Sequence, residues 1–363
     1  MPKNHAYFMG LAMKLALKGK GKTSPNPMVG ALVVKKGRII GRGYHEKAGS
    51  AHAEAIALDE AGSNAKGATL YVTLEPCAHF GRTPPCVDRI IKSGVKEVIV
   101  GMVDPNPLNN GRGINILRQH KLKVEAGILE DELKKLNEVF IKYITRKIPF
   151  VTVKVGQSLD GKIATKSGDS KWITSDKSRA YVHRMRQGYD AVMVGVNTVL
   201  RDNPTLDPWF SKKKLTKIVV DSQLSIHEEA NIFSSGAPVI VVTLSIAAGQ
   251  ETENRKILAQ KARILEAKEK EGQINLKDMM KKLAGLEITN ILVEGGGTLI
   301  GALFDEGLVD KVCIFISPKI IGGKDAISSV EGKGITRIDK AIRLRGVKLK
   351  RIGEDFLVEG YIA

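Results

Sequence analysis

Short apolar segments of strand length alternate with stretches of helical spacing along nearly all of the 363-residue chain. This alternation is typical of α/β folds, in which helices cover the faces of a sheet. In the first half, segments 29–34 and 38–43 flank a Lys-Lys-Gly turn and predict a hairpin. The second half predicts a largely parallel central sheet. Its expected strands are 151–155, 191–194, 218–220, 239–242, 291–293 and 312–316.

We expect a boundary between two domains near Pro149. Residues 130–147 have the spacing of one long amphipathic helix, which Pro149 must end because proline lacks an N–H and restricts the residue before it. The chain length also favours two domains over one. The expected domains are therefore 1–147 and 148–363. Within the second, segment 261–282 is dense in lysine and glutamate and predicts a solvated helical face.

Composition restricts the class of protein. The apolar segments are too often interrupted by charge to cross a membrane, and the segment 6–13 ends at Lys14 without a cleavage pattern, which argues against secretion. Three cysteines exclude a disulfide scaffold and favour a reducing compartment, so we expect a cytoplasmic protein. The net charge of +18 suits nucleic acid, phosphorylated metabolites or a lysine-rich surface, and does not decide among them.

The most informative residues are one histidine and two cysteines in the first half. His52-Ala53-Glu54 is followed by Pro76-Cys77 and then Cys86. An imidazole and two thiolates make a three-ligand zinc set with an open fourth position, as in catalytic sites. Both ligand groups are expected at helix starts, where thiolates are favoured. Zinc lowers the pKa of bound water to about 7, and Glu54 is near enough to move its proton as a general acid and base.

This pattern resembles the zinc-dependent cytidine deaminase superfamily, whose signature is H-x-E followed by P-C-x-x-C. Here eight residues, 78–85, separate the two cysteines in place of two. That insertion, together with 24–27, 43–45 and 104–107, is similar to the deaminase half of the bifunctional deaminase-reductases of riboflavin biosynthesis. The resemblance implies a cytidine-deaminase-like α/β/α domain with one zinc ion per chain.

The same resemblance implies a pocket for a pyrimidine and its ribose phosphate. Its lining would be Asn26, His45, His79, Arg82, Asp104 and Asn106. Amides and a carboxylate suit a polar heterocycle, and Arg82 suits a phosphate. Asn26 and Asn106 also lie in proline-flanked turns, where asparagine is common, so turn formation is an alternative reason for both.

A glycine run follows a predicted strand in the second half. Residues 288–293 lead into Glu294, Gly295-Gly296-Gly297 and Thr298, and 299–304 have helical spacing. Glycines at a strand-to-helix turn let backbone N–H groups approach a phosphate at the helix N-terminus. The spacing differs from G-x-G-x-x-G, and a plain tight turn explains the run equally well.

Further segments resemble the reductase half of the same family, which has a dihydrofolate-reductase-like α/β fold and uses NADPH. They are 154–162, 170–175, 195–200 and 202–206, so the resemblance extends from about Tyr7 to Ile362. It implies NADPH-binding roles for Gly156, Trp172, Thr198, Asp202, Ser222, Gly296, Gly297, Thr298, Leu299, Ile300, Gly301 and Ala302. It implies substrate contacts for Lys154, Ser170, Arg186, Leu206 and Glu294.

Some positions in this half have competing explanations. Trp172 is alternatively a core aromatic, and Glu294 alternatively a helix cap. After Leu206 the family pattern often supplies an arginine for the substrate phosphate, whereas this chain has Asp207-Pro208-Trp209, with Lys212 to Lys214 as substitutes. The apolar segment 312–316 places Cys313 in the core, and no motif surrounds His183, which we expect to be a surface or structural histidine.

The implied activity has two steps. They are zinc-hydroxide deamination of 2,5-diamino-6-ribosylamino-4(3H)-pyrimidinone 5′-phosphate and NADPH reduction of the ribosyl group to ribityl. The partner is this phosphorylated pyrimidine, without nucleic acid or membrane, and the family suggests a homo-oligomer. A nucleic-acid-editing zinc deaminase with a basic module is the alternative that the charge favours, although aromatic residues are only 5% of the chain. A non-catalytic zinc regulator would have no use for Glu54.

Overall fold

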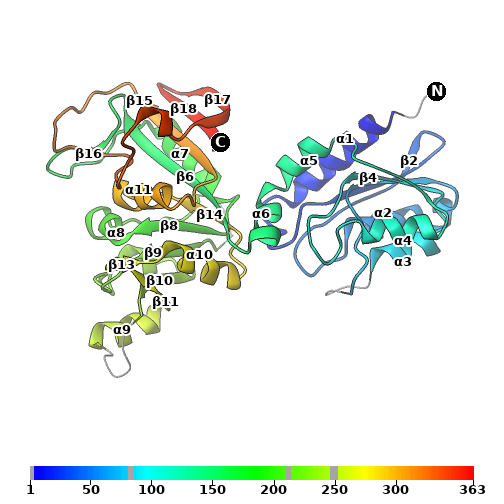
Figure 1. Cartoon of the computed structure of the whole chain (residues 1–363), viewed down its shortest axis with the longest axis horizontal. Helices are drawn as coiled ribbons and strands as arrows, with labels where there is room; N and C mark the ends of the chain where they lie inside the picture. Colours follow the sequence, from blue (N-terminus) through cyan, green and yellow to red (C-terminus); the bar gives the residue numbers. More distant parts are fainter. Residues whose placement is uncertain (1–3, 81–84, 210–213, 246–251) are drawn as a thin grey trace. The chain divides into compact units, whose positions relative to one another are not determined.

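The computed structural model describes residues 4–80, 85–209, 214–245 and 252–363. The chain divides into two compact units, Met1–Lys147 and Ile148–Ala363, each with its own sheet and hydrophobic core (Figure 1). The expected α/β class is confirmed in both units. Among the described residues, no helix combines the length and the apolar character needed to cross a membrane.

The first unit is a five-stranded sheet between two layers of helices. The strands are β1 Gly30–Lys35, β2 Arg38–Tyr44, β3 Thr69–Leu74, β4 Glu97–Met102 and β5 Lys123–Ala126. The helices are α1 His5–Ala16, α2 Ala53–Ala61, α3 Cys86–Lys92, α4 Arg112–Gln119, α5 Glu130–Leu136 and α6 Glu138–Arg146. The order is β2-β1-β3-β4-β5, with β1 antiparallel to β2 and β3, and with β3, β4 and β5 parallel. The expected hairpin of β1 and β2 is confirmed. Figure 1 shows α1 and α5 on one face of the sheet and α2, α3 and α4 on the other.

Helix α2 packs directly on the backbone of β2. A Cβ at Gly41 would lie 2.1 Å from Ala57 O, and one at Gly43 would lie 2.1 Å from Ala53 O. Glycine in the strand and alanine in the helix therefore allow an approach that larger side chains would prevent. This contact sets the position of the first turn of α2, which carries His52 and Glu54.

The segment 130–147, predicted as one helix, forms the two helices α5 and α6. Asn137 lies between them with φ −104° and ψ 22°. Its side chain accepts a hydrogen bond from Met28 N at 2.9 Å and donates one to Met28 O at 3.1 Å. These bonds satisfy the backbone ahead of β1 and hold the break in place. The single-helix prediction is wrong because helical spacing carries no information about this long-range contact.

The second unit is built on a nine-stranded sheet in the order β11-β10-β9-β8-β14-β6-β15-β18-β17. Its strands are β6 Phe150–Ser158, β8 Ala191–Gly195, β9 Thr216–Val220, β10 Val239–Leu244, β11 Arg263–Ala267, β14 Asn290–Val293, β15 Lys311–Ser317, β17 Leu344–Ile352 and β18 Asp355–Ile362. Two short pairs are β7 Lys162–Ala164 with β16 Ile327–Ser328, and β12 Glu269–Lys270 with β13 Gln273–Ile274. All neighbours from β11 to β15 are parallel, and only the pairings of β18 with β15 and with β17 are antiparallel, so the largely parallel sheet is confirmed.

Helices cover both faces of this sheet. They are α7 Asp176–Arg186, α8 Val196–Asp202, α9 Glu253–Lys261, α10 Leu276–Gly285 and α11 Gly297–Asp305. Buried residues of α10 and α11 belong to one core cluster, and those of α8 and α9 belong to another. Cys313 on β15 is 1% exposed, which confirms its place in the core.

The segment 261–282, predicted as a solvated helical face, contains β11, the short β12–β13 pair and most of α10. β11 pairs in parallel with β10 at the edge of the sheet. Met279, Met280 and Leu283 of α10 are fully or almost fully buried. The prediction is wrong because the charges are spread over an edge strand, a turn and a half-buried helix, whose exposed sides all carry lysine and glutamate.

Replacing Gly43 with alanine should destabilise the first unit, because the added Cβ would lie 2.1 Å from Ala53 O and α2 would have to move. Such overpacking costs about 1–3 kcal/mol, so we expect a lower calorimetric transition temperature for this unit. Both tryptophans lie in the second unit, so the transition followed by tryptophan fluorescence should stay unchanged. Gly285→Ala is the control, because a Cβ there meets no atom within 4 Å. An unchanged transition for Gly43→Ala would contradict the tight contact of α2 with β2.

Candidate active sites

His52, Cys77 and Cys86 come together at the ends of three elements in the first unit. His52 is the N-cap of α2, Cys86 begins α3, and Cys77 lies in the loop after β3. His52 Nδ1 lies 3.1 Å from Cys86 Sγ and 3.6 Å from Cys77 Sγ, and the three atoms lie within 4.8 Å of one another. One nitrogen and two sulfurs at this spacing fit a tetrahedral zinc ion with one position left for water.

The expectation that both cysteines begin helices is wrong for Cys77. Its sulfur instead accepts a hydrogen bond at 3.3 Å from the backbone N–H of Cys86, at the N-terminus of α3. The helix therefore favours the Cys77 thiolate although Cys77 lies outside it. The pKa of Cys77 is lowered, mainly by the hydrogen bond from the Cys86 thiol, and the pKa of Cys86 is raised by the same bond and by burial.

Glu54 lies in the first turn of α2, two residues after His52, and is 4% exposed. Burial raises its pKa to about 7, although the His52 charge acts in the opposite direction. A carboxyl group with a pKa near neutrality takes up and releases protons readily, as general acid–base catalysis requires. The geometry fits the expected role of Glu54, which stays a prediction.

The residues expected to bind the pyrimidine form two groups next to these donors. Asn26 Nδ2 lies 3.1 Å from His45 Nε2, and the His45 ring meets the His52 ring edge-on at 5.6 Å. His79 follows Cys77 by two residues and acts electrostatically on Asp104, whose pKa burial raises to about 6. Arg82 lies outside the described residues.

Turn formation involves both expected asparagines. Asn106 Oδ1 accepts from Leu108 N at 3.1 Å, and its N–H donates to Asp104 Oδ1 at 2.9 Å. The N–H of Asn26 donates to Thr23 O at 2.7 Å. The substrate roles of Asn26 and Asn106 therefore stay predictions beside a turn role that the structure contains.

Two buried residues that hold the Cys77 loop were not found from the sequence. Asn109 Oδ1 accepts from Ala78 N at 2.9 Å, and its Nδ2 donates to Pro76 O and to Asp104 Oδ2, each at 3.2 Å. The Glu75 carboxylate accepts backbone N–H bonds from Asp104, Gly111 and Ile114. The position of Glu75 directly before Pro76-Cys77 could have identified it from the sequence. No local pattern identifies Asn109.

In the second unit, several expected cofactor and substrate residues lie at the edge where the parallel strands end. Their positions are Lys154 and Gly156 on β6, Thr198 and Asp202 on α8, Ser222 just after β9 and Glu294 just after β14. Ligands of open α/β sheets bind at this edge. The topology thus brings together segments that are far apart in the sequence.

Glu294 is the centre of a buried ion cluster. Arg186 Nε and Nη2 donate to its two oxygens at 2.7 and 3.0 Å, and Lys154 Nζ donates to Oε2 at 2.8 Å. Burial acts to raise the pKa of Glu294, but Arg186 and Lys154 outweigh it and the pKa is lowered. The helix-cap interpretation of Glu294 is wrong, because Gly296 is the N-cap of α11 and no side chain caps it.

Trp172 is 62% exposed, so the core-aromatic interpretation is wrong. The Arg179 guanidinium lies 4.2 Å from the centre of its ring. Ser170 Oγ donates to Asp202 Oδ1 at 3.1 Å, which joins an expected substrate residue to an expected cofactor residue. An exposed aromatic ring next to this contact fits a ligand-binding surface, and the NADPH roles of Trp172 and Asp202 stay predictions.

The glycine run 295–297 does not form a turn that only glycine can adopt. None of its three residues has a positive φ, so a left-handed turn does not explain the run. A Cβ at Gly297 would lie 2.3 Å from Ser328 O, and one at Gly301 would lie 2.0 Å from Glu331 O. Close packing of the segment 328–331 on α11 therefore explains these two glycines.

The first turn of α11 also contacts a carboxylate. Thr298 Oγ1 donates to Glu331 Oε2 at 2.7 Å, so an anion already lies at this helix N-terminus. Leu299 and Ile300 belong to the hydrophobic core, and Ala302 packs against it. Only the backbone of Leu299 and Ile300 is then available to a cofactor, and the NADPH role of this turn stays a prediction.

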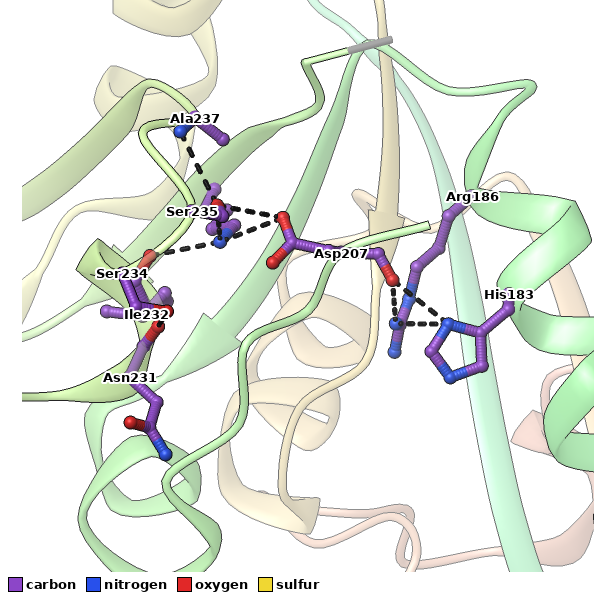
Figure 2. A network of polar contacts seen from close by, with 9 residues as sticks. His183, Arg186, Asp207, Asn231, Ile232, Ser234, Ser235 and Ala237 are labelled. Carbon is purple, nitrogen blue, oxygen red and sulfur yellow. Dashed lines mark hydrogen bonds and ion pairs between the residues drawn. The ribbon is translucent and has the colours of Figure 1, made fainter. Parts of the chain in front are cut away.

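Asp207, in the segment after Leu206, lies against Arg186 (Figure 2). Asp207 O accepts from Arg186 Nη1 at 3.0 Å, and His183 Nδ1 lies 2.9 Å from the same oxygen. The His183 ring stacks on Trp209 with 3.8 Å between centroids. His183 thus contacts the candidate site, and its place three residues before Arg186 on α7 was the available signal. Lys212 and Lys213 lie outside the described residues.

Two family models match the chain. The RibD C-terminal domain matches residues 149–358, and the cytidine and deoxycytidylate deaminase zinc-binding region matches residues 2–102. The nucleic-acid-editing alternative is not favoured, because the second unit matches a reductase-type domain where that alternative needs a basic nucleic-acid module.

Similar proteins cover almost the whole chain. The riboflavin biosynthesis protein RibD of Aquifex aeolicus is 46% identical over 97% of this chain and 96% of the relative. RibD of Escherichia coli is 38% identical over 96% of this chain and 97% of the relative.

Solved structures are also similar to this chain over almost its whole length. Acinetobacter baumannii RibD has a TM-score of 0.88 at 34% identity, and covers 99% of both chains. A Thermotoga maritima diaminohydroxyphosphoribosylaminopyrimidine deaminase/5-amino-6-(5-phosphoribosylamino)uracil reductase has a TM-score of 0.87 at 38% identity, again with 99% of both chains. From its two domains and its full-length relatives, the chain belongs to the RibD family of riboflavin biosynthesis proteins.

Proposed function

We propose that this bifunctional enzyme of riboflavin biosynthesis acts twice on one phosphorylated pyrimidine. The first unit deaminates 2,5-diamino-6-ribosylamino-4(3H)-pyrimidinone 5′-phosphate by hydrolysis, and the second reduces the ribosyl group of the product to ribityl with NADPH. The observation that carries the proposal is the His52, Cys77 and Cys86 donor set, within 4.8 Å, next to buried Glu54. The match of residues 149–358 to the RibD C-terminal domain supports the second activity.

In the first unit, zinc held by His52, Cys77 and Cys86 would supply an activated water. The Glu54 carboxylate would take up a proton from the attacking water and pass it to the departing amine, which would leave as ammonia. Its pKa of about 7 suits both the uptake and the return. Asp104 and His45, whose ring meets the His52 ring edge-on at 5.6 Å, would hold the pyrimidine ring.

In the second unit, NADPH supplies the hydride when it is bound. Arg186 and Lys154 carry two positive charges around the single charge of Glu294, so the cluster keeps a net positive charge. An excess of cationic N–H donors at the strand ends suits the hydroxyl and phosphate oxygens of the substrate. Glu294 orients both cations and stops either from turning to solvent.

One zinc ion and one NADPH per chain complete the proposal, together with a cytoplasmic location. All three cysteines are free thiols. A reducing compartment keeps Cys77 and Cys86 available as zinc ligands, since a disulfide between them would remove both.

Mass spectrometry of the pyrimidine after incubation with the enzyme tests the two steps. Exchange of an amine for an oxo group should add about one mass unit, and NADPH should then add about two. Unchanged substrate with zinc-loaded enzyme would contradict the deaminase proposal, and a first step without a second would contradict the reductase proposal.

Glu54→Gln should abolish ammonia release, because glutamine cannot carry a proton. Zinc content and NADPH oxidation on the deaminated intermediate should stay at wild-type levels. Glu60→Gln is the control, since Glu60 is an exposed carboxylate on the same helix. Loss of both activities in a folded Glu54→Gln protein would contradict the separation into two sites.

Removing zinc with a chelator should stop deamination and leave reduction of the deaminated intermediate intact, because the donor set lies in the first unit. Readdition of Zn²⁺ should restore ammonia release in proportion to bound metal. Ammonia release at the full rate by metal-free protein would contradict the zinc role.

Arg186→Lys should raise the KM for the deaminated intermediate by about tenfold or more, because lysine cannot make the two parallel bonds to Glu294. Deamination should be unaffected. Arg184→Lys is the control, since Arg184 is exposed on the same helix. Equal kinetics for both variants would show that Arg186 has no part in substrate binding.

A further inference from the structure

Lys217 is a lysine without solvent exposure on an otherwise apolar strand. It lies on β9, and its side chain is 0% exposed. Nζ donates to Ile232 O at 3.0 Å and to Ser235 Oγ at 2.8 Å, and lies 3.0 Å from Asp207 Oδ1. A buried ammonium group without a counter-ion is strongly unfavourable. Asp207 is therefore held close to β9 by the need to neutralise Lys217.

Asp207 links this buried lysine to the candidate substrate site. Ser235 Oγ donates to the same carboxylate oxygen at 3.0 Å, so Lys217, Ser235 and Asp207 form a closed set of polar contacts. Figure 2 shows the Asp207 carboxylate pointing toward Ser235 and the Asp207 carbonyl toward Arg186 and His183. One residue is thus bound through its side chain on one side and through its backbone on the other.

All three guanidinium nitrogens of Arg186 are engaged by this arrangement. Nε and Nη2 bond to Glu294, and Nη1 bonds to Asp207 O at 3.0 Å. Glu294 fixes the plane of the guanidinium from one edge, and the Asp207 carbonyl fixes it from another. The orientation of Arg186 therefore depends on where the Asp207 backbone lies.

We propose that Lys217 is a positioning residue for the reductase step. By anchoring the Asp207 carboxylate, Lys217 places the Asp207 carbonyl against Arg186 and holds Leu206, the preceding residue, in its buried position. Lys217 acts through Asp207 and does not touch the substrate. The inference rests on the proposed function of the second unit.

The location of the anchor supports this assignment. Asp207 lies between the two cations, since its Oδ1 is 3.0 Å from Lys217 Nζ and its carbonyl oxygen is 3.0 Å from Arg186 Nη1. Burial lowers the pKa of Lys217, Asp207 acts to raise it, and the Arg186 charge lowers it further. The charges of Lys217 and Arg186 therefore interact electrostatically, and Asp207 lies between them.

Steady-state kinetics of the full chain with the deaminated intermediate and NADPH test the inference. Lys217→Met keeps an unbranched side chain, one atom shorter, and removes its charge. We expect its KM for the intermediate to rise by about tenfold, with kcat, the KM for NADPH and the deaminase rate each within about twofold of wild type. Lys217→Arg, which keeps the charge, should retain a KM near that of wild type.

A double-mutant cycle with Asp207→Asn separates positioning from general damage. If Lys217 acts through Asp207, the double variant should have the same KM as Lys217→Met, because the second change removes nothing further. Lys350→Met is the control, since it removes an ion pair between Lys350 on β17 and Glu359 on β18. Its kinetics should match those of wild type.

A wild-type KM for the intermediate in Lys217→Met would overturn the inference. So would a fall in kcat together with equal rises in the KM for the intermediate and the KM for NADPH. If Lys217→Met does not fold, Ser235→Ala decides, because Ser235 is exposed and contacts both Lys217 and Asp207. A KM raised severalfold in Ser235→Ala supports the inference, and an unchanged KM overturns it. Wild-type enzyme without NADPH-dependent reduction would instead contradict the proposed function itself.

Discussion

The candidate site of the second unit depends on one constraint, which is that a charge removed from water needs a partner. Glu294 is bound by Arg186 and Lys154, and Lys217 is paired with Asp207. Removing one member of such a pair leaves the other charge buried and unpaired, so the surrounding backbone is held in one arrangement. Glu54 differs, because burial dominates its environment and raises its pKa to about 7. The paired charges of Glu294 and Lys217 hold the backbone around them in place. Glu54, whose charge is only weakly compensated, is suited to proton transfer.

Parallel strands provide the second common principle. In the first unit β3 and β4 are parallel, and Cys77 follows one while Asp104 follows the other. In the second unit Glu294 follows β14 and Ser222 follows β9, again on parallel strands. Because the carboxyl ends of parallel strands meet at one edge, loops far apart in sequence supply neighbouring side chains. Both candidate sites, one in each unit, are thus built at the carboxyl ends of parallel strands.

The wrong predictions share a physical cause. Helical spacing in 130–147 is real on both sides of Asn137, and the bonds of Asn137 to Met28 lie at the break. Lysine and glutamate in 261–282 marked exposure correctly for much of the segment, but exposure is common to edge strands, turns and outer helix faces. Local patterns report which side of an element meets water. They do not report contacts between residues a hundred positions apart.

The sequence by itself determined the α/β class and the donor set of His52, Cys77 and Cys86, because these follow from residue type, order and periodicity. The residues at the strand ends were implied by the resemblance to a known family. Tertiary structure alone decided that Arg186 and Lys154 converge on Glu294, that Asn109 holds the Cys77 loop, and that Asp207 joins Lys217 to Arg186. Each of these contacts pairs residues from different elements. Their partners are chosen by the packing of the sheet and by the need to neutralise buried charge, which no local pattern records.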